Sequence, residues 1–175
     1  MDIIYKKYNH NPSHLFSPNS KYFITGATYK KKIWFKSNEA KERLLKSIII
    51  GFDHHGWILE DWVILDNAPD DSSNLPGMLQ EIHKFVALWI KKNIPESSSS
   101  EKIMYNYWDT CITYEVSCFA RLDYIWNNPV KQGYTDNVEE WVYGSYFKKV
   151  EKDKEELEKI IKKYPCGKVK VKDDF

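Results

Sequence analysis

The clearest pattern in the chain is a run of aromatic, β-branched and small residues at positions 22–29, which lies between a turn-prone Ser-Pro-Asn-Ser and three lysines. Such a run predicts a β-strand. Residues 104–113 carry a similar pattern and predict another strand. Residues 56–65 are apolar on both sides of Glu60 and Asp61, which predicts a strand pair or one strand bent at the two acids.

Apolar residues at helical spacing separate these strands. Ser37 precedes one such stripe, which predicts a helix that ends near Gly51. A second helix is predicted from about residue 75. A third is predicted over residues 115–127, because the residue that precedes Pro129 disfavours the α region. The charged stretch near the C-terminus carries a thin apolar stripe and predicts a last helix.

These elements predict an α+β fold in which helices pack against one antiparallel sheet. Residues 1–147 are expected to form a single domain, and residues 148–175 a charged C-terminal helix and tail. The chain has 175 residues, of which 42% are apolar and 15% aromatic, so a packed core is expected and an intrinsically disordered chain is excluded.

Neither a membrane nor an oxidising compartment is indicated. No apolar run approaches the roughly 20 residues that a membrane helix needs. The first twelve residues contain no apolar signal-peptide core, so we expect a cytoplasmic protein. The three cysteines are odd in number and have no Cys-x-x-Cys spacing, which indicates neither a disulfide framework nor a zinc knuckle.

Charge is unevenly distributed along the chain. The first fifty residues hold ten Lys or Arg against three Asp or Glu, although the net charge of the whole protein is only +1. This basic segment is either a surface for a polyanion or a solvated lysine-rich face. Lys30, Lys31 and Lys32 follow the first predicted strand, where they suit sequence-independent contact with a nucleic-acid backbone.

The third predicted helix carries a candidate nucleophile. On a helical wheel, Trp126 lies on the apolar side and is expected to anchor the helix. Arg121, Tyr124 and Asn128 lie on the opposite side. A tyrosine beside a guanidinium and an amide is either a nucleophile with an electrostatic partner or an ordinary surface tyrosine. Arg121 is a candidate for holding a phosphate, with a salt bridge as the alternative.

Four stretches of the chain, in the same order, resemble the single-tyrosine HUH transposases, in particular the REP-associated tyrosine transposases and related insertion-sequence enzymes. The stretches are residues 12–28, 56–67, 107–113 and 121–146. The segments YFITGAT and YIWNNPVKQG are fairly specific, and four ordered matches are stronger than one motif. The C-terminal helix lies outside the resemblance.

The resemblance implies a ferredoxin-like α+β domain that forms a homodimer and binds hairpin or single-stranded DNA. Enzymes of this family cut one strand by attack of a helix tyrosine on a phosphodiester, which leaves a 5′-phosphotyrosine and a free 3′-hydroxyl. The resemblance assigns the nucleophile to Tyr124 and places Asn128 where the family often has an oxygen-bearing metal ligand. It also implies a divalent metal, Mg²⁺ or Mn²⁺.

The sequence departs from the family at its defining motif. The family places a His-hydrophobic-His pair on a strand directly after an asparagine, so that both imidazoles share one face and hold one cation. Here Asn67 is followed by Ala-Pro-Asp-Asp, and neither histidine is present. Asp70, like its acidic neighbours, is an oxygen donor suited to magnesium, but turn composition also explains it. The adjacent His54 and His55 are a weaker candidate pair.

These observations predict a DNA-binding protein of the transposase family whose own metal site is impaired. Two alternatives stay open at this point. The first is a working transposase that uses substitute carboxylates, Asp70 or Asp71, with Asn128. The second is a recruited module that binds DNA or another protein without catalysis. Whether the chain still cuts DNA is therefore not decided by the sequence.

Overall fold

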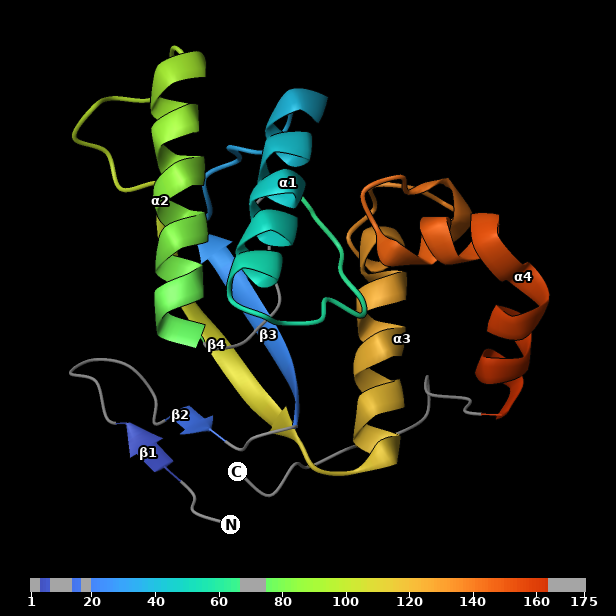
Figure 1. Ribbon diagram of the computed structural model, residues 1–175. Coiled ribbons are helices and arrows are strands. Elements are labelled where there is room, and N and C mark those ends of the chain that lie inside the picture. The colour runs from blue at the N-terminus through green and yellow to red at the C-terminus, as the bar shows by residue number, and fades with distance from the viewer. Residues whose placement is uncertain (1–3, 7–13, 17–19, 67–74, 164–175) are drawn as a thin grey trace. The chain divides into compact units, whose positions relative to one another are not determined.

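A computed structural model of the 175-residue chain describes residues 4–6, 14–16, 20–66 and 75–163 (Figure 1). Its elements are β1 (Ile4–Lys6), β2 (His14–Phe16), β3 (Lys21–Thr28), the 3₁₀ turn η1 (Tyr29–Lys31), α1 (Asn38–His54), α2 (Leu75–Asn93), β4 (Met104–Ile112), α3 (Glu115–Lys131), the 3₁₀ turn η2 (Val138–Glu140) and α4 (Ser145–Lys163). The predicted α+β class is confirmed. The ferredoxin-like arrangement stays a prediction.

The described strands form two small sheets. β1 pairs with β2 in antiparallel register, with Ile4 opposite Phe16. β3 pairs with β4, and the two arrows run in opposite directions in Figure 1. The sequence pattern predicted β3 and β4 but not the two short N-terminal strands. Within the described part of the chain, no helix is long and apolar enough to cross a bilayer.

The chain divides into two compact units. Unit 1 consists of residues 1–23, 61–63 and 109–175, and unit 2 of residues 24–60 and 64–108. Unit 1 therefore includes α3 and α4, and unit 2 includes α1 and α2. The boundary expected at residues 147 and 148 stays a prediction.

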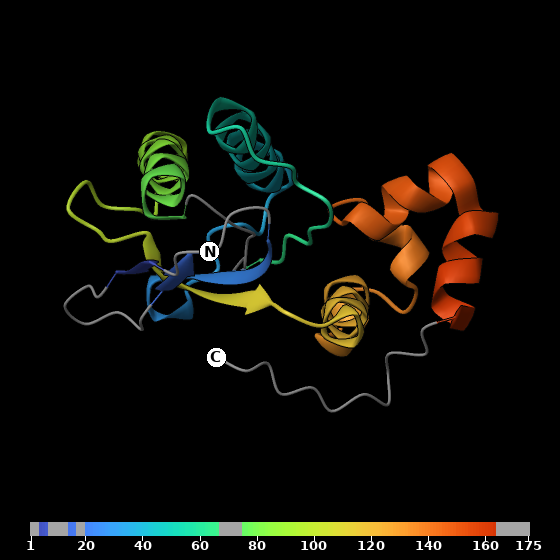
Figure 2. The same cartoon turned by 60° about the horizontal axis from the view of Figure 1, so that its bottom comes forward.

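In unit 2, α1 and α2 lie on the same side of the β3–β4 ribbon (Figure 2). The two helices approach closely at Gly51 of α1. A Cβ atom at this position would lie only 2.7 Å from Cγ1 of Ile82 on α2. The core between the elements is apolar, and its fully buried side chains include Phe35, Leu44 and Leu79. Burial of such side chains is the main force that holds the helices on the sheet.

The first helix follows its predicted start and passes its predicted end. Ser37 is the N-cap residue, and its side chain accepts a hydrogen bond from the backbone N–H of Ala40 at 3.2 Å. This cap satisfies one of the donors that a helix leaves unpaired at its start. The helix continues through Gly51 to His54, and the chain then turns at Gly56, which has a φ of +72°. The glycine at 51 therefore serves helix packing, whereas Gly56 serves the turn.

The predicted end of the third helix is wrong. α3 runs to Lys131, with Pro129 inside its last turn. A proline near the end of a helix removes a single internal hydrogen bond, and its fixed φ is already helical. The backbone N–H of Gln132 still donates to the carbonyl of Asn128 at 2.9 Å, so the helical turn closes beyond the proline.

The charged last helix is confirmed over its described residues as α4, although its backbone is interrupted. Asp153 has non-helical angles, φ −161° and ψ 89°. Its carboxylate accepts a hydrogen bond from the backbone N–H of Glu156 at 2.9 Å. Asp153 therefore acts as the N-cap of a second helical segment within α4.

The strand or strand pair predicted at residues 56–65 does not form. Of this segment only Val63 pairs, in an isolated antiparallel bridge with Gly144. The backbone of Trp62 instead bonds to Ser145, since its N–H donates to the Ser145 hydroxyl at 3.1 Å and its carbonyl accepts from the Ser145 N–H at 2.8 Å. A partner from the start of α4 thus replaces the expected sheet neighbour.

Candidate functional site

Tyr124 lies on the surface of unit 1. Its side chain is 43% exposed, which agrees with its predicted position away from the apolar side of the helix. The ring meets Phe23 edge-to-face, with the centroids 5.8 Å apart and the planes at 83°. This geometry is favourable for two aromatic rings and limits the orientations of the phenol. The hydroxyl-bearing side chain is therefore accessible and its ring is positioned.

One cationic side chain lies near the Tyr124 ring, and another lies over the ring of its aromatic partner, Phe23. The Lys131 ammonium lies 6.0 Å from the centroid of the Tyr124 ring, and the Arg121 guanidinium carbon lies 4.8 Å from the centroid of Phe23. Lys131 also lies 3.6 Å from the carboxylate of Asp123. A guanidinium and an ammonium beside an accessible phenol form a surface that suits an anion such as a phosphodiester.

Asn128 does not share the exposed face of Tyr124, so this part of the helical-wheel prediction is wrong. The Asn128 side chain is 2% exposed, and the neighbouring Pro129 is also buried. Positions four apart on a helix differ by only about 40° in direction, so packing around the last turn, rather than the position on the helical wheel, buries Asn128. Asp70, the other proposed metal ligand, lies outside the described residues.

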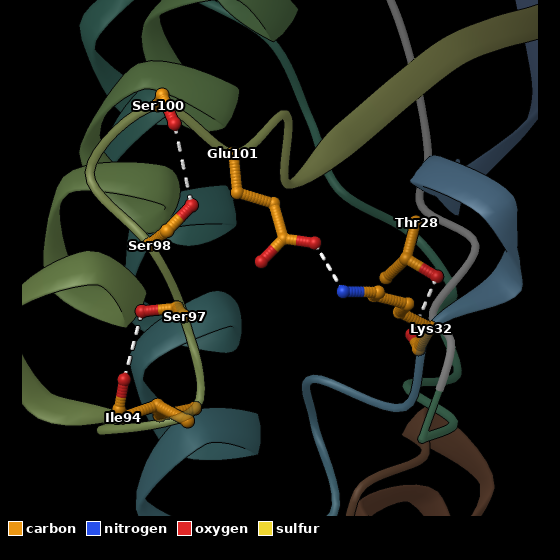
Figure 3. Close-up of polar contacts among 7 residues, drawn as sticks. All are labelled: Thr28, Lys32, Ile94, Ser97, Ser98, Ser100 and Glu101. Atoms are coloured by element: carbon orange, nitrogen blue, oxygen red, sulfur yellow. Dashed lines mark hydrogen bonds and ion pairs between the residues drawn. The ribbon is translucent and has the colours of Figure 1, made fainter.

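The three lysines after β3 differ in their contacts. Lys30 and Lys31 are exposed and have positive φ angles of 55° and 54°. Lys32 forms an ion pair with Glu101, and its carbonyl accepts a 2.7 Å hydrogen bond from the Thr28 hydroxyl (Figure 3). The hydrogen bond from Lys32 holds the pKa of Glu101 below its usual value. Lys32 is therefore paired with an acid, whereas Lys30 and Lys31 are exposed lysines that form no ion pair with the described residues.

Two tyrosines that the sequence analysis did not single out lie beside these lysines in unit 2. The rings of Tyr29 and Tyr105 are 6.1 Å apart and tilted by 37°. The Lys102 ammonium lies 5.4 Å from the first ring centroid and 5.2 Å from the second, and the Lys30 ammonium lies 5.6 Å from that of Tyr29. This cluster of Tyr29, Lys30, Lys102 and Tyr105, the tyrosine–lysine cluster, combines aromatic faces with mobile positive charges.

A buried carboxylate joins three elements of unit 1. Asp61 is 4% exposed. It accepts hydrogen bonds from Trp126 Nε1 at 2.8 Å, from the Ser145 hydroxyl at 2.7 Å and from the Lys149 ammonium at 2.6 Å. The expectation that Trp126 anchors the tyrosine helix is thus supported by a polar contact as well as by burial. The sequence signal was an acid within an apolar segment, but its partners lie more than sixty residues away.

A second carboxylate, in unit 2, faces two imidazoles. Glu81 Oε2 lies 3.0 Å from His55 Nε2 and 3.3 Å from His54 Nδ1. The hydrogen bond from His55 is the main cause that lowers the pKa of Glu81. Among the described residues, these three form the group of His, Cys, Asp or Glu side chains whose donor atoms converge, all within 4.8 Å of one another. The sequence analysis considered the two histidines but not Glu81.

The fold of this chain has a match among solved structures. A structure of a REP-associated tyrosine transposase bound to a REP hairpin matches it with a TM-score of 0.65 at 17% sequence identity, over 97% of this chain and 94% of that protein. No protein-family model matches the chain, and no curated protein matches it significantly. The structural match agrees with the resemblance seen in the sequence, and it establishes that this chain has the fold of a tyrosine transposase.

Proposed function

We propose that this protein binds hairpin or single-stranded DNA in the manner of a tyrosine transposase, and that its metal-dependent strand cleavage is impaired. The observation that carries the proposal is the accessible Tyr124, with Lys131 near its ring and Arg121 over the neighbouring ring of Phe23, on the fold of a transposase whose structure was determined with a DNA hairpin. DNA as partner comes from that likeness, and the cationic flank of the tyrosine supports it.

The tyrosine–lysine cluster supports DNA contact in unit 2. The lysines of the cluster provide charge for the phosphates, and the exposed Tyr105 beside the half-buried Tyr29 provides a surface on which unpaired bases stack. Lys30 and Lys31 are better placed for this contact than Lys32, because Glu101 already holds the Lys32 charge. The contacts that this cluster offers to a single strand therefore include both charge and stacking.

In a cleaving enzyme of this fold, the Tyr124 oxygen would attack phosphorus. A phosphorus–oxygen bond to the tyrosine would form and the bond to the 3′ oxygen would break, while the phenol proton passes through solvent to that oxygen, which leaves as a hydroxyl. Arg121 and Lys131 are placed to neutralise phosphate charge. Their charges orient the strand beside the phenol whether or not the bond breaks.

The described residues around Tyr124 do not fit the divalent metal that the family implies. The side chains that flank the phenol are cations, and the amide expected to supply a ligand is buried. A Mg²⁺ or Mn²⁺ ion is held by several carboxylates and other oxygen donors, whereas the carboxylate described near this flank, that of Asp123, is paired with Lys131. We therefore propose that the chain retains DNA binding and has lost efficient cleavage.

The proposal is tested with purified protein and a 3′-labelled DNA hairpin that has a single-stranded flank, in Mg²⁺ or Mn²⁺, because a 5′-phosphotyrosine retains the fragment that carries the 3′ end. We expect binding in gel-shift assays that weakens as salt rises, without a covalent adduct on denaturing gels. An adduct that Tyr124→Phe abolishes would contradict the impaired site and support a working transposase with substitute ligands at Asp70 or Asp71. Absence of binding at low salt would contradict the DNA-binding proposal and support a protein-interaction module.

A homodimer in the cytoplasm is the assembly and location that we propose with this function. The homodimer is proposed from the family resemblance, and the location is proposed from the sequence pattern. Size-exclusion chromatography with light scattering, with and without the hairpin, measures the assembly directly. A mass of one chain in both conditions would contradict the dimer.

A further inference from the structure

We propose that His54, His55 and Glu81 bind a divalent transition-metal ion, such as Zn²⁺, at a site that serves the stability of unit 2 rather than strand cleavage. The site uses two imidazole nitrogens from the end of α1 and one carboxylate oxygen from α2. It lies at the end of a helix, and so differs from a histidine pair on a strand.

The distances between the donor atoms suit a small cation. Zinc binds imidazole nitrogen and carboxylate oxygen at about 2.0–2.2 Å, so neighbouring ligands of a tetrahedral ion lie roughly 3.3 Å apart. Glu81 Oε2 lies 3.0 Å from His55 Nε2 and 3.3 Å from His54 Nδ1. All three atoms lie within 4.8 Å, so the two imidazole nitrogens need to approach by at most about 1.5 Å.

Helix packing holds the less mobile part of the site in place. The close contact of Gly51 with Ile82 fixes the end of α1 against the residue that follows Glu81. His55 is the C-cap of α1, and its backbone N–H donates to the Gly51 carbonyl at 3.1 Å. The imidazole of His54 is 66% exposed and free to rotate into place. Two ligands are thus positioned and the third is adjustable.

The surroundings of the donor atoms leave room for an ion. Glu81 Oε2 already faces the nitrogens of both imidazoles, at 3.0 and 3.3 Å. The His55 imidazole is not crowded from α2, because even a Cβ at Gly77 would only reach ordinary contact, 3.9 Å from His55 Cε1. Water completes the coordination, because the His54 edge is open to solvent.

The donor set selects the class of metal. Imidazole with carboxylate suits Zn²⁺, Co²⁺ or Ni²⁺, whereas Mg²⁺ prefers a set of oxygen ligands. Metal binding requires imidazole nitrogens without protons, so affinity falls as the pH is lowered. A bound ion connects α1 to α2 and stabilises the folded state in proportion to metal concentration, because the unfolded chain does not hold the three donors together.

The experiment uses the full chain after treatment with chelator, without DNA, in reducing buffer. Zn²⁺ and Mg²⁺ are titrated by calorimetry and in thermal melts. We expect one saturable Zn²⁺ site, a melting temperature that rises with Zn²⁺, and no such rise with Mg²⁺. Both His55→Gln and Glu81→Gln should weaken Zn²⁺ binding at least tenfold, and His54→Gln should weaken it less.

Glu42→Gln, at an exposed glutamate elsewhere on α1, is the matched control and should bind as the parent does. The glutamine variants keep all three cysteines, so binding by thiolates would survive in them. Unchanged Zn²⁺ affinity in His55→Gln and Glu81→Gln, with circular dichroism showing folded protein, would overturn the proposal. DNA takes no part in these measurements, so their outcome is separate from that of the proposed function.

Discussion

Two carboxylates show how differently the two units use an acidic side chain. Asp61 in unit 1 is 4% exposed and accepts from an indole, a hydroxyl and an ammonium. Glu81 in unit 2 is partly exposed and faces two imidazoles. An indole, a hydroxyl and an ammonium donate hydrogen bonds to Asp61 but are not metal ligands here, whereas imidazole is a common metal ligand. The first carboxylate is therefore structural, and the second is available for a ligand.

The largest expected effect comes from removing the buried acid. Asp61→Ala leaves the Trp126 indole and the Ser145 hydroxyl without their acceptor and Lys149 without its counter-charge. Breaking a buried ion pair costs about 3–5 kcal/mol, and we expect about 3 kcal/mol because Lys149 is 39% exposed and can be hydrated. Urea denaturation measures the loss. Glu60→Gln, at the exposed neighbouring acid, should change the unfolding free energy little, and equal losses in the two variants would break the comparison.

A smaller effect is expected where α1 meets α2 on the Glu81 side. Gly51→Ala places a methyl group 2.7 Å from Cγ1 of the buried Ile82. Overpacking of this kind costs about 1–3 kcal/mol, partly offset by about 0.5–1 kcal/mol from better helix propensity. Gly77→Ala is the matched control, because its methyl would meet only His55 Cε1 at 3.9 Å. We expect a lower melting temperature in the first variant and not in the second, together with weaker Zn²⁺ binding in the first.

The two units are also expected to contribute differently to DNA binding. Replacing Lys30 and Lys31 by alanine should weaken binding severalfold and reduce the slope of log affinity against log salt by about 1.4 for a single strand, since each phosphate contact contributes about 0.7. Lys152→Ala with Lys159→Ala removes the same charge from exposed positions on α4. Gel-shift assays over a range of salt concentrations compare the two double variants. Equal slopes of log affinity against log salt would contradict a role of Lys30 and Lys31 in DNA binding.

The smallest effect concerns pH. Hydrogen bonding to His55 lowers the folded-state pKa of Glu81, so its contribution to stability is present above the ordinary pKa near 4.5 and is lost as pH falls through the lowered value. Glu39 and Glu101 also have lowered pKa values and titrate in the same range. The measurement is therefore the difference between the parent and Glu81→Gln in melts from pH 6 to 3. We expect that difference to shrink below about pH 4.5, and a constant difference would argue against a folded-state role for the charge.

Local patterns predicted much of the fold. The aromatic and β-branched run gave the position of β3, and apolar spacing with the Ser37 cap located α1. The prediction of a strand or strand pair at residues 56–65 was wrong because the hydrogen-bonding partners of this segment, Gly144 and Ser145, lie about eighty residues later. No local signal specifies these partners. The predicted end of α3 was wrong because the hydrogen bond that Pro129 removes from the last turn costs less free energy than the packing of that turn contributes.

The candidate sites show the same contrast between features that local spacing predicts and features that depend on tertiary packing. Helical spacing correctly placed Tyr124 on an accessible face, because it depends only on neighbours along one helix. It misplaced Asn128, whose burial depends on packing around the last turn. The convergence of His54 and His55 on Glu81 depends on how closely α1 approaches α2, which a sequence without a structure does not reveal.

The contacts of Asp61 also set an order for synthesis of the chain. Its acceptor atoms meet Ser145 and Lys149, which lie 84 and 88 positions later. At a translation rate of roughly 5–20 residues per second, the ribosome adds Ser145 about 4–17 s after it has added Asp61. During that interval water is its partner. The hydrogen bonds of Asp61 in unit 1 can consequently form only after α1 and α2 have been synthesised.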